Sequence, residues 1–414
     1  MYHYFPNTVA TYWMNSAVVH AASIGATLGD ISNAAAPYKA FHDKHAAAFA
    51  SAPPVSSDHE GAAQTVPPAL VAVLQEGAPI WTTAWLETGK RIKAQGDKDL
   101  KLDRKLSAAS KYRRAAALMT AVEWGMPKSA EKSGVFHAIR DLVKKRLELE
   151  DVSFEAVTIP YDGKALDGWY FPGCGAAIPK PTLLAYNGFH SSMDWYVQTG
   201  AVEAITRRGV NILVFDHPGA GTARHVHGLP LNPETEHSAS AALDWLESRS
   251  DVNADHLGVI GASFGGYYAI RAAAYEKRFK YAYCWGGWYY WPPEEIFEGG
   301  NPDAACSSSI EMADLEDLFW ITGTATKREL YDLVTRFHLK DVCPDVTCPV
   351  FIIHGEDDAQ LTPWHAEQVI ERCMNAPRKE LHMVRKGEGG TMHCHVDSLI
   401  GPLNLLADRV AETL

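Results

Sequence analysis

Residues 257–268 hold a serine in a pattern that could make it a nucleophile. An apolar run with β-branched residues leads into Gly-x-Ser-x-Gly at residues 261–265, and alanine-rich sequence typical of a helix follows at once. A strand, a sharp turn and a helix in this order project the hydroxyl of Ser263, and Cβ atoms at positions 261 and 265 would collide with the neighbouring strand and helix. The first amides of such a helix also point at the place where negative charge would develop. The pattern predicts that Ser263 is a catalytic nucleophile.

A serine hydroxyl is a poor nucleophile at neutral pH, so it needs a histidine base, and that base needs an acid to orient it. A later buried strand ends in His-Gly-Glu-Asp-Asp, which makes Asp358 the predicted acid and Asp357 the alternative. A glycine-rich loop near the C-terminus holds two histidines, of which His393 is the predicted base and His395 the alternative. The order Ser, Asp, His along the chain is typical of one class of serine hydrolase.

Backbone amides and aromatic rings complete the predicted site. The oxyanion hole is expected to use the amide of Phe264, the residue after the nucleophile, and that of Phe189 in the loop after the third strand. Several rings follow a later strand, beyond the point where alternation would bury them in the core. They could seal an interface or line an apolar cleft, and Trp288, Tyr289 and Trp291 are the candidate substrate-binding residues.

The elements that must position these residues begin near residue 151, where the apolar period changes from 3.6 towards 2. An antiparallel hairpin at 152–171 is followed by short apolar runs that alternate with helices, as expected for strands buried on both faces. The expected strands after the hairpin are 182–186, 210–215, 256–260, 281–285, 350–354 and 380–384. The fold class is therefore α/β, a mostly parallel sheet with an antiparallel start, in the order expected for an α/β-hydrolase.

The N-terminal part has a different character and is predicted to form a second domain. Residues 1–150 are rich in alanine and carry apolar residues at helical spacing, so we expect a helical cap or lid domain. Residues 151–414 would form the catalytic domain. An excursion at about 288–346 is too long for a structureless loop and is expected to help cover the site.

The long helix expected at 106–124 has an apolar face that must pack against something. The open top of the sheet, with the rings at 288–291, is the expected partner, and this would close an aromatic cleft. Such a cleft favours a bulky, flat, largely uncharged substrate. The leftover cap surface suggests a homodimer. Charged residues on this helix, among them Glu123, are expected to lie on its solvated face.

Composition excludes several function classes. The 414 residues carry a formal charge of -12 and no basic cluster free of acidic or apolar residues, which argues against nucleic-acid binding. No apolar run approaches membrane-spanning length and no signal-peptide pattern is present, so a cytoplasmic location without membrane contact is expected. Seven cysteines without a C-x-x-C pair argue against a disulfide framework. His393, Cys394 and His395 lack a further ligand cluster, so no metal is expected.

Taken together, these motifs resemble the FrsA-like branch of the α/β-hydrolase superfamily over roughly residues 150–412. The resemblance is carried by Asp-x-Pro-Gly-x-Gly from Asp216, the serine motif with Gly-Tyr-Tyr-Ala after it, the aspartate after His-Gly, and the late histidine. This branch includes the bacterial 2,6-dihydroxypseudooxynicotine hydrolase and fungal pigment-pathway hydrolases that shorten polyketides. The sequence departs from the usual pattern at Asn187, where a glycine is common, and at residues 391–392.

The resemblance implies hydrolysis of a carbon-carbon bond next to a ketone, or of an ester, without a cofactor and through Ser263, Asp358 and His393. The favoured hypothesis is cleavage of a β-diketone or polyketide-like, aromatic substrate. An esterase or lactonase, and an acyltransferase or cyclase of a biosynthetic pathway, would need the same three residues. A non-catalytic binding protein with this fold is the remaining alternative, and the intact set of three residues argues against it.

Overall fold

The sheet that carries the predicted site has eight strands. The computed structural model describes residues 4–5, 8, 10–52, 68–304 and 312–414. The strand order is β1-β2-β4-β3-β5-β6-β7-β8. The strands are β1 (Glu155–Tyr161), β2 (Lys164–Phe171), β3 (Lys180–Tyr186), β4 (Asn211–Phe215), β5 (Val252–Ala262), β6 (Tyr281–Trp285), β7 (Val350–Gly355) and β8 (Lys379–Val384).

Only the start of this sheet is antiparallel. Strand β1 pairs with β2, and β2 with β4, in the antiparallel sense, whereas every pairing from β4 across to β8 is parallel. Strands β4 and β7 are buried along their whole length. Their continuous apolar sequences are therefore explained by helices on both faces. The predicted fold class, an α/β-hydrolase fold with an antiparallel start, is confirmed.

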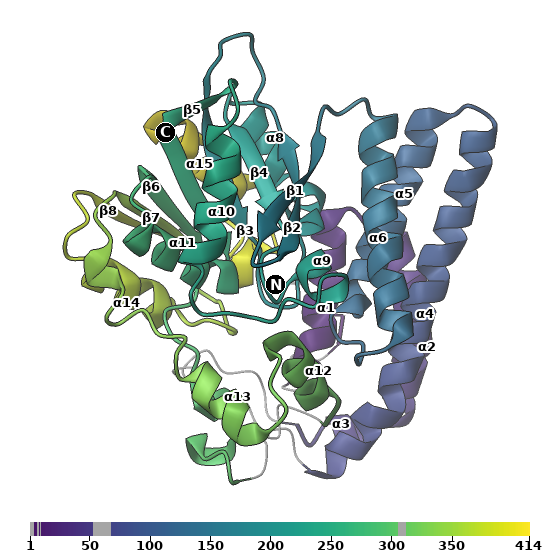
Figure 1. Cartoon of the computed structure of the whole chain (residues 1–414). Coiled ribbons are helices and arrows are strands. Elements are labelled where there is room, and N and C mark those ends of the chain that lie inside the picture. Colours follow the sequence, from purple (N-terminus) through teal and green to yellow (C-terminus); the bar gives the residue numbers. More distant parts are fainter. Residues whose placement is uncertain (1–3, 6–7, 9, 53–67, 305–311) are drawn as a thin grey trace.

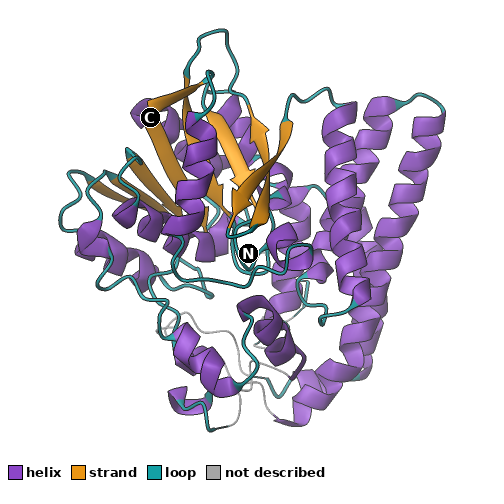
Figure 2. Ribbon diagram, viewed as in Figure 1, coloured by secondary structure: helices purple, strands orange, loops and turns teal. Residues whose placement is uncertain are grey.

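Helices cover both faces of the sheet (Figure 2). Their apolar side chains divide between two cores, one on each face. The first core holds α7 (Asp194–Gln198), α8 (Ala201–Thr206) and α15 (Ile400–Thr413). The second holds α10 (Glu236–Glu247), α11 (Phe264–Tyr275) and α14 (Pro363–Arg372).

The N-terminal region is helical, as predicted, and stands beside the sheet (Figure 1). The long helices α4, α5 and α6 run side by side, and α5 is the most enclosed of them because α1, α4 and α6 all pack on it. These helices share the apolar core of the α8 and α15 face. The helices are α1 (Tyr12–Ile24), α2 (Leu28–Lys44), α3 (Ala46–Phe49), α4 (Pro68–Lys101), α5 (Lys105–Glu123) and α6 (Ala130–Leu149).

The excursion between β6 and β7 contains two described helices, α12 (Met312–Thr322) and α13 (Lys327–Val334). Its apolar residues join the core on the α10 and α11 face. The rings at 288–291 belong to this same core, with Tyr289 and Trp291 almost fully buried. The expectation that they meet the apolar face of helix α5 is therefore wrong, because α5 and these rings lie in different cores.

Two further expectations about the elements need correction. Residues 194–208 lie between two of the expected strands, where the alternation of strands and helices predicts a single helix. They form two helices, α7 and α8, because Gly200 has φ +82°, a left-handed conformation that interrupts a helix. Glu123 was expected on a solvated helix face, yet it is buried at the end of α5. In the described part of the chain, no helix has the length and apolar character needed to cross a membrane.

Candidate active site

Ser263 occupies the turn between β5 and α11, and its backbone has φ 56° and ψ −126°. This region is strained for a residue with a side chain. Two glycines allow the strand and helix to approach so closely: a Cβ at Gly261 would lie 1.7 Å from the carbonyl oxygen of Gly265. A Cβ at Gly265 would lie 2.3 Å from the carbonyl oxygen of Tyr186 in β3. The hydroxyl is thus held at the carboxyl end of the central strands.

His393 and Asp358 lie in a hydrogen-bonded series with Ser263. The Nε2 atom of His393 is 2.8 Å from the Oγ atom of Ser263, and its Nδ1 atom is 2.7 Å from the Oδ2 atom of Asp358. Both residues come from loops after parallel strands, Asp358 after β7 and His393 after β8. Three residues that are up to 130 positions apart in sequence therefore meet at one edge of the sheet. Nδ1–H donating to a carboxylate leaves Nε2 free to accept the serine proton.

The carboxylate of Asp358 is itself held by the backbone. Its Oδ1 atom accepts hydrogen bonds from the amides of Gln360 and Leu361, at 3.0 and 2.8 Å. Burial alone would raise the pKa of Asp358, but His393, the neighbouring His354 and the amide of Leu361 lower it. Burial would likewise lower the pKa of His393, and the charge of Asp358 outweighs it and holds that pKa well above the ordinary value.

The alternative acid and base lie elsewhere. Asp357 accepts a hydrogen bond from Thr391 at 2.9 Å and pairs with Lys386 at 3.2 Å. His395 is fully buried, and its Nδ1 atom donates to the carbonyl oxygen of Gly390. Asp357 and His395 therefore stabilise the loops in which they lie. His393 is the histidine that contacts the serine hydroxyl.

The loop after β3 brings the first predicted oxyanion donor beside the serine. A Cβ at Gly188 would lie 3.0 Å from the Cβ of Ser263, so the chain passes directly over the nucleophile. Among the described residues, neither the amide of Phe189 nor that of Phe264 is engaged in a hydrogen bond. Two free amides beside a serine hydroxyl suit the binding of an oxyanion.

The predicted substrate-binding rings differ in their surroundings. The Phe264 ring lies 5.2 Å from Trp288 and 5.3 Å from Trp291, and Trp291 also lies 5.1 Å from Phe189. Of these, Trp288 and Phe189 are only partly buried. Tyr289 packs instead against Trp364 at 5.6 Å and is almost fully buried. Trp288 is therefore the predicted ring that best fits contact with a substrate.

Helix α1 of the N-terminal region lies close to the same three residues. The pKa of His20 is lowered to about 4 by burial and then by the charge of His393. Burial and then the charge of Asp358 raise the pKa of Tyr12. The indole N–H of Trp195 donates to His20 Nε2 at 2.9 Å, which ties α1 to the loop beside the nucleophile. No sequence pattern indicated these contacts, because the partners are more than 150 residues apart.

Buried ion pairs also hold the helical region to the loops of the site. Arg140 of α6 contacts the carboxylates of both Asp194 and Asp216, and the two carboxylates are buried. Asp216 also accepts hydrogen bonds from the amides of Met193 and Thr222, at 2.7 and 2.8 Å. Asp216, the first residue of the Asp-x-Pro-Gly motif, thereby connects the segments at Met193 and Thr222 to α6.

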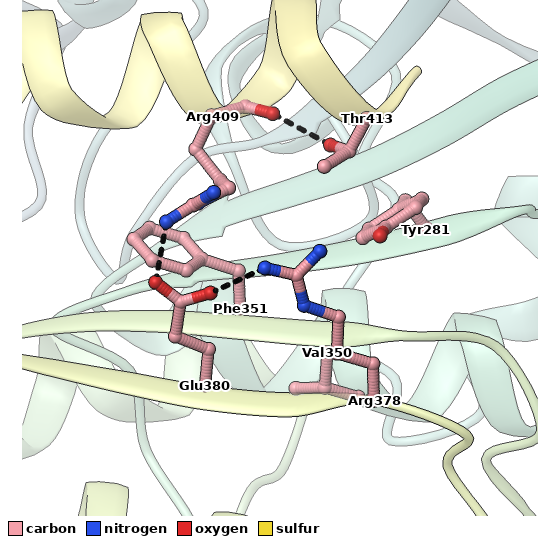
Figure 3. Close-up of a pocket in the computed structure, with 7 residues that line it drawn as sticks. All are labelled: Tyr281, Val350, Phe351, Arg378, Glu380, Arg409 and Thr413. Carbon is pink, nitrogen blue, oxygen red and sulfur yellow. Dashed lines mark hydrogen bonds and ion pairs between the residues drawn. The ribbon is translucent and has the colours of Figure 1, made fainter.

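A separate hollow lies at the opposite end of the strands (Figure 3). It is lined by the first residues of β6 and β7, and Glu380 crosses it to contact Arg378 and Arg409. The ion pair with Arg409 holds β8 to α15. Because Ser263 follows the last residue of β5, this hollow is remote from the nucleophile.

Comparisons with known proteins agree with this architecture. The sequence model of the prolyl oligopeptidase family matches residues 234–390, which include the nucleophile turn and the aspartate loop. A hydrolase of Aspergillus aculeatus is 25% identical, over 87% of this chain and 93% of its own. The 20-hydroxy-prefusarin hydrolase of Gibberella moniliformis is 25% identical, over 79% and 86%.

A bacterial relative is similar in both sequence and structure. The 2,6-dihydropseudooxynicotine hydrolase of Paenarthrobacter nicotinovorans is 22% identical, over 81% of this chain and 84% of its own. The crystal structure of a 2,6-dihydroxy-pseudo-oxynicotine hydrolase superposes with a TM-score of 0.68 and 19% identity, covering 96% of this chain and 95% of that one. The chain has the α/β-hydrolase fold, and these similarities show that it is a hydrolase enzyme.

The hydrogen bond between His393 and Asp358 generates a prediction about protonation. Replacing Asp358→Asn removes the charge that holds the pKa of His393 up, so that pKa should fall below its wild-type value. The imidazole would then lose its proton at lower pH than in the wild type. Titration of the histidine signals by NMR measures this directly. An unchanged His393 pKa in a folded variant would contradict the assigned pair.

Proposed function

We propose that this enzyme is a cofactor-independent serine hydrolase that cleaves a carbon-carbon bond next to a ketone. The observation that carries the proposal is the hydrogen-bonded series from Asp358 through His393 to Ser263. In the proposed reaction, Ser263 attacks the carbonyl carbon of the substrate while His393 takes the proton of the serine hydroxyl. Asp358 keeps the imidazole in the orientation and tautomer that this transfer needs. The amides of Phe189 and Phe264 bind the oxyanion of the tetrahedral intermediate.

The proposed substrate is a β-diketone or a polyketide-like compound with an aromatic part. The partly buried ring of Trp288 lies beside the nucleophile turn and offers a flat apolar wall. Trp291 supports it from the core, whereas Tyr289 contributes only through packing. Two of the relatives are named as hydrolases of 20-hydroxy-prefusarin and of 2,6-dihydropseudooxynicotine, which supports a complex organic substrate.

Helices 1–150 act as the cap in this proposal. The contacts of Tyr12 and His20 with the surroundings of Asp358 and His393 support that role, since they cover one side of the three residues. A catalytic unit at 151–414, a homodimer and a cytoplasmic location stay predictions. An ester or lactone substrate, and transfer of the acyl group to an acceptor other than water, would use the same residues.

The first test replaces Ser263→Ala and follows the cleavage of benzoylacetone, a simple aromatic β-diketone. Loss of a nucleophile in such a series reduces kcat by about 10⁴-fold to 10⁶-fold. Product analysis of the wild type should yield a carboxylic acid and a methyl ketone, with and without an added alcohol or amine acceptor. Near-full turnover by the alanine variant would refute the mechanism, and products joined to the acceptor would identify an acyltransferase.

The two histidines of the last loop provide a matched pair of variants. His393→Ala should lose several orders of magnitude in kcat, because no other base among the residues that the structure describes contacts the Ser263 hydroxyl. His395→Ala removes a hydrogen bond to the Gly390 carbonyl and should lower stability more than kcat per folded molecule. Steady-state kinetics, normalised by the folded fraction from circular dichroism, separate the two. A dead His395→Ala with an active His393→Ala would reverse the assignment.

A further inference from the structure

The loop after β3, which passes over Ser263, contains a strained turn. The amide of Ser191 donates to the carbonyl oxygen of Gly188 at 3.2 Å, which closes a turn with Phe189 and His190 at its centre. His190 has φ 61°, a left-handed conformation that residues with a side chain rarely adopt. Such a conformation persists only where the surrounding structure holds it. The contacts of this turn therefore determine where the Phe189 amide lies.

One end of the turn lies against the nucleophile. A Cβ at Gly188 would lie 3.0 Å from the Cβ of Ser263 and 3.4 Å from its Oγ atom. The amide of the next residue, Phe189, is the predicted oxyanion donor. Such donors act at about 2.7–3.1 Å from the oxyanion. A small displacement of this turn would therefore weaken the binding of the oxyanion.

The start of the turn is fixed to the end of β4. The side-chain amide of Asn187 donates to the carbonyl oxygen of Phe215 at 3.2 Å. The Nε2 atom of His217 lies 3.1 Å from the carbonyl oxygen of Asn187. These contacts hold the residue before Gly188. The far side of the turn, at His190, needs support from another segment.

Asp317 of α12 contacts the turn at His190. Its Oδ2 atom lies 3.1 Å from the Nδ1 atom of His190, and the carboxylate is almost fully buried. Within the described ranges, no other carboxylate lies at ion-pair distance from His190. Burial lowers the pKa of His190, although Asp317 opposes this shift. A neutral imidazole with its proton on Nδ1 presents that proton to Asp317.

Lys132 of α6 holds Asp317 from the other side. Its Nζ atom donates to the Oδ1 atom of Asp317 at 2.9 Å and to the carbonyl oxygen of Met126 at 2.8 Å. Burial would raise the pKa of Asp317, but His190 and Lys132 outweigh it and hold that pKa well below its ordinary value. One charged carboxylate of the excursion therefore contacts both the helical region and the loop over the nucleophile.

We propose that Asp317 is a positioning residue for the oxyanion hole. Held by Lys132, its carboxylate fixes His190 and with it the strained turn that presents the Phe189 amide to the oxyanion. The excursion and α6 then affect catalysis through this loop, without touching the substrate. The inference rests on the proposed serine mechanism, in which the Phe189 amide binds the oxyanion.

The first arm of the test is Asp317→Asn, which keeps the shape of the side chain and removes its charge. Because the loss of one oxyanion donor lowers kcat by about 10²-fold to 10³-fold, its displacement should lower kcat by about 10-fold to 100-fold. KM should stay within about threefold, since the oxyanion exists only after the attack. Benzoylacetone and p-nitrophenyl acetate should lose the same factor, because both reactions pass through an oxyanion. Rates are expressed per folded molecule, from circular dichroism.

The second arm is His190→Asn, because asparagine also accepts a left-handed φ and only the imidazole contact is lost. It should lower kcat by a similar factor. The double variant should lose no more than the larger single loss, because both changes remove the same contact. If Asp317→Asn does not fold because the buried Lys132 loses its counter-charge, Lys132→Met combined with Asp317→Leu removes both charges and should show the same loss in kcat.

Glu316→Gln is the matched control, since Glu316 is exposed on the same helix, and its kcat should equal that of the wild type. An unchanged kcat in Asp317→Asn or in His190→Asn, or losses that multiply in the double variant, would overturn the inference. A loss confined to one of the two substrates would also overturn it, because it would indicate a direct contact with that substrate. A wild type that hydrolyses the ester but leaves benzoylacetone intact would instead overturn the proposed carbon-carbon cleavage, and the ester would still test the role of Asp317.

Discussion

The strained backbone at Ser263 is the constraint on which the rest of the site depends. A backbone conformation with φ 56° and ψ −126° costs on the order of 1–3 kcal/mol of folding free energy. The close packing of the neighbouring segments holds the residue in it. Gly261 and Gly265 allow the backbones of β5 and α11 to come into direct contact. The same closeness brings Gly188 over the serine. The hydroxyl is thereby presented to His393, whose Nε2 atom lies 2.8 Å away.

The helical region contributes charge as well as cover. Arg140 of α6 pairs with two buried carboxylates, Asp194 and Asp216, and these ion pairs would be costly to leave incomplete. Lys132, also on α6, pairs with Asp317 of the excursion. The positions of these segments therefore depend on α6 as well as on the sheet.

Sequence patterns predicted most of the sheet, because a strand buried on both faces is a short apolar run. The expected strand began at residue 256 and missed residues 252–255, because Asn253 and Asp255 are polar and interrupt any apolar run at this end of β5. The division at Gly200 was missed because a single glycine inside a helical pattern does not reveal its φ angle. Ser263, Asp358 and His393 were predicted from chain order and strand ends, and the structure brings them into one hydrogen-bonded series.

The surroundings of the site could not be predicted in this way. Glu123 has the sequence context of a solvated helix residue, and only the packing of α5 between other helices buries it. His20 and Tyr12 reach the site from a helix with no motif. Such contacts depend on how the N-terminal helices pack against the segments around the sheet. A single sequence has no periodic pattern that predicts this packing.

The most direct test of the central claim is the labelling of the folded protein by a fluorophosphonate probe, mapped by peptide mass spectrometry. Such probes react with a serine whose hydroxyl is activated by a neighbouring base and whose oxyanion is bound. We expect one label, on Ser263, which disappears when the protein is unfolded in urea before the reaction. A folded protein that stays unlabelled, or that carries its label on another serine, would contradict the account.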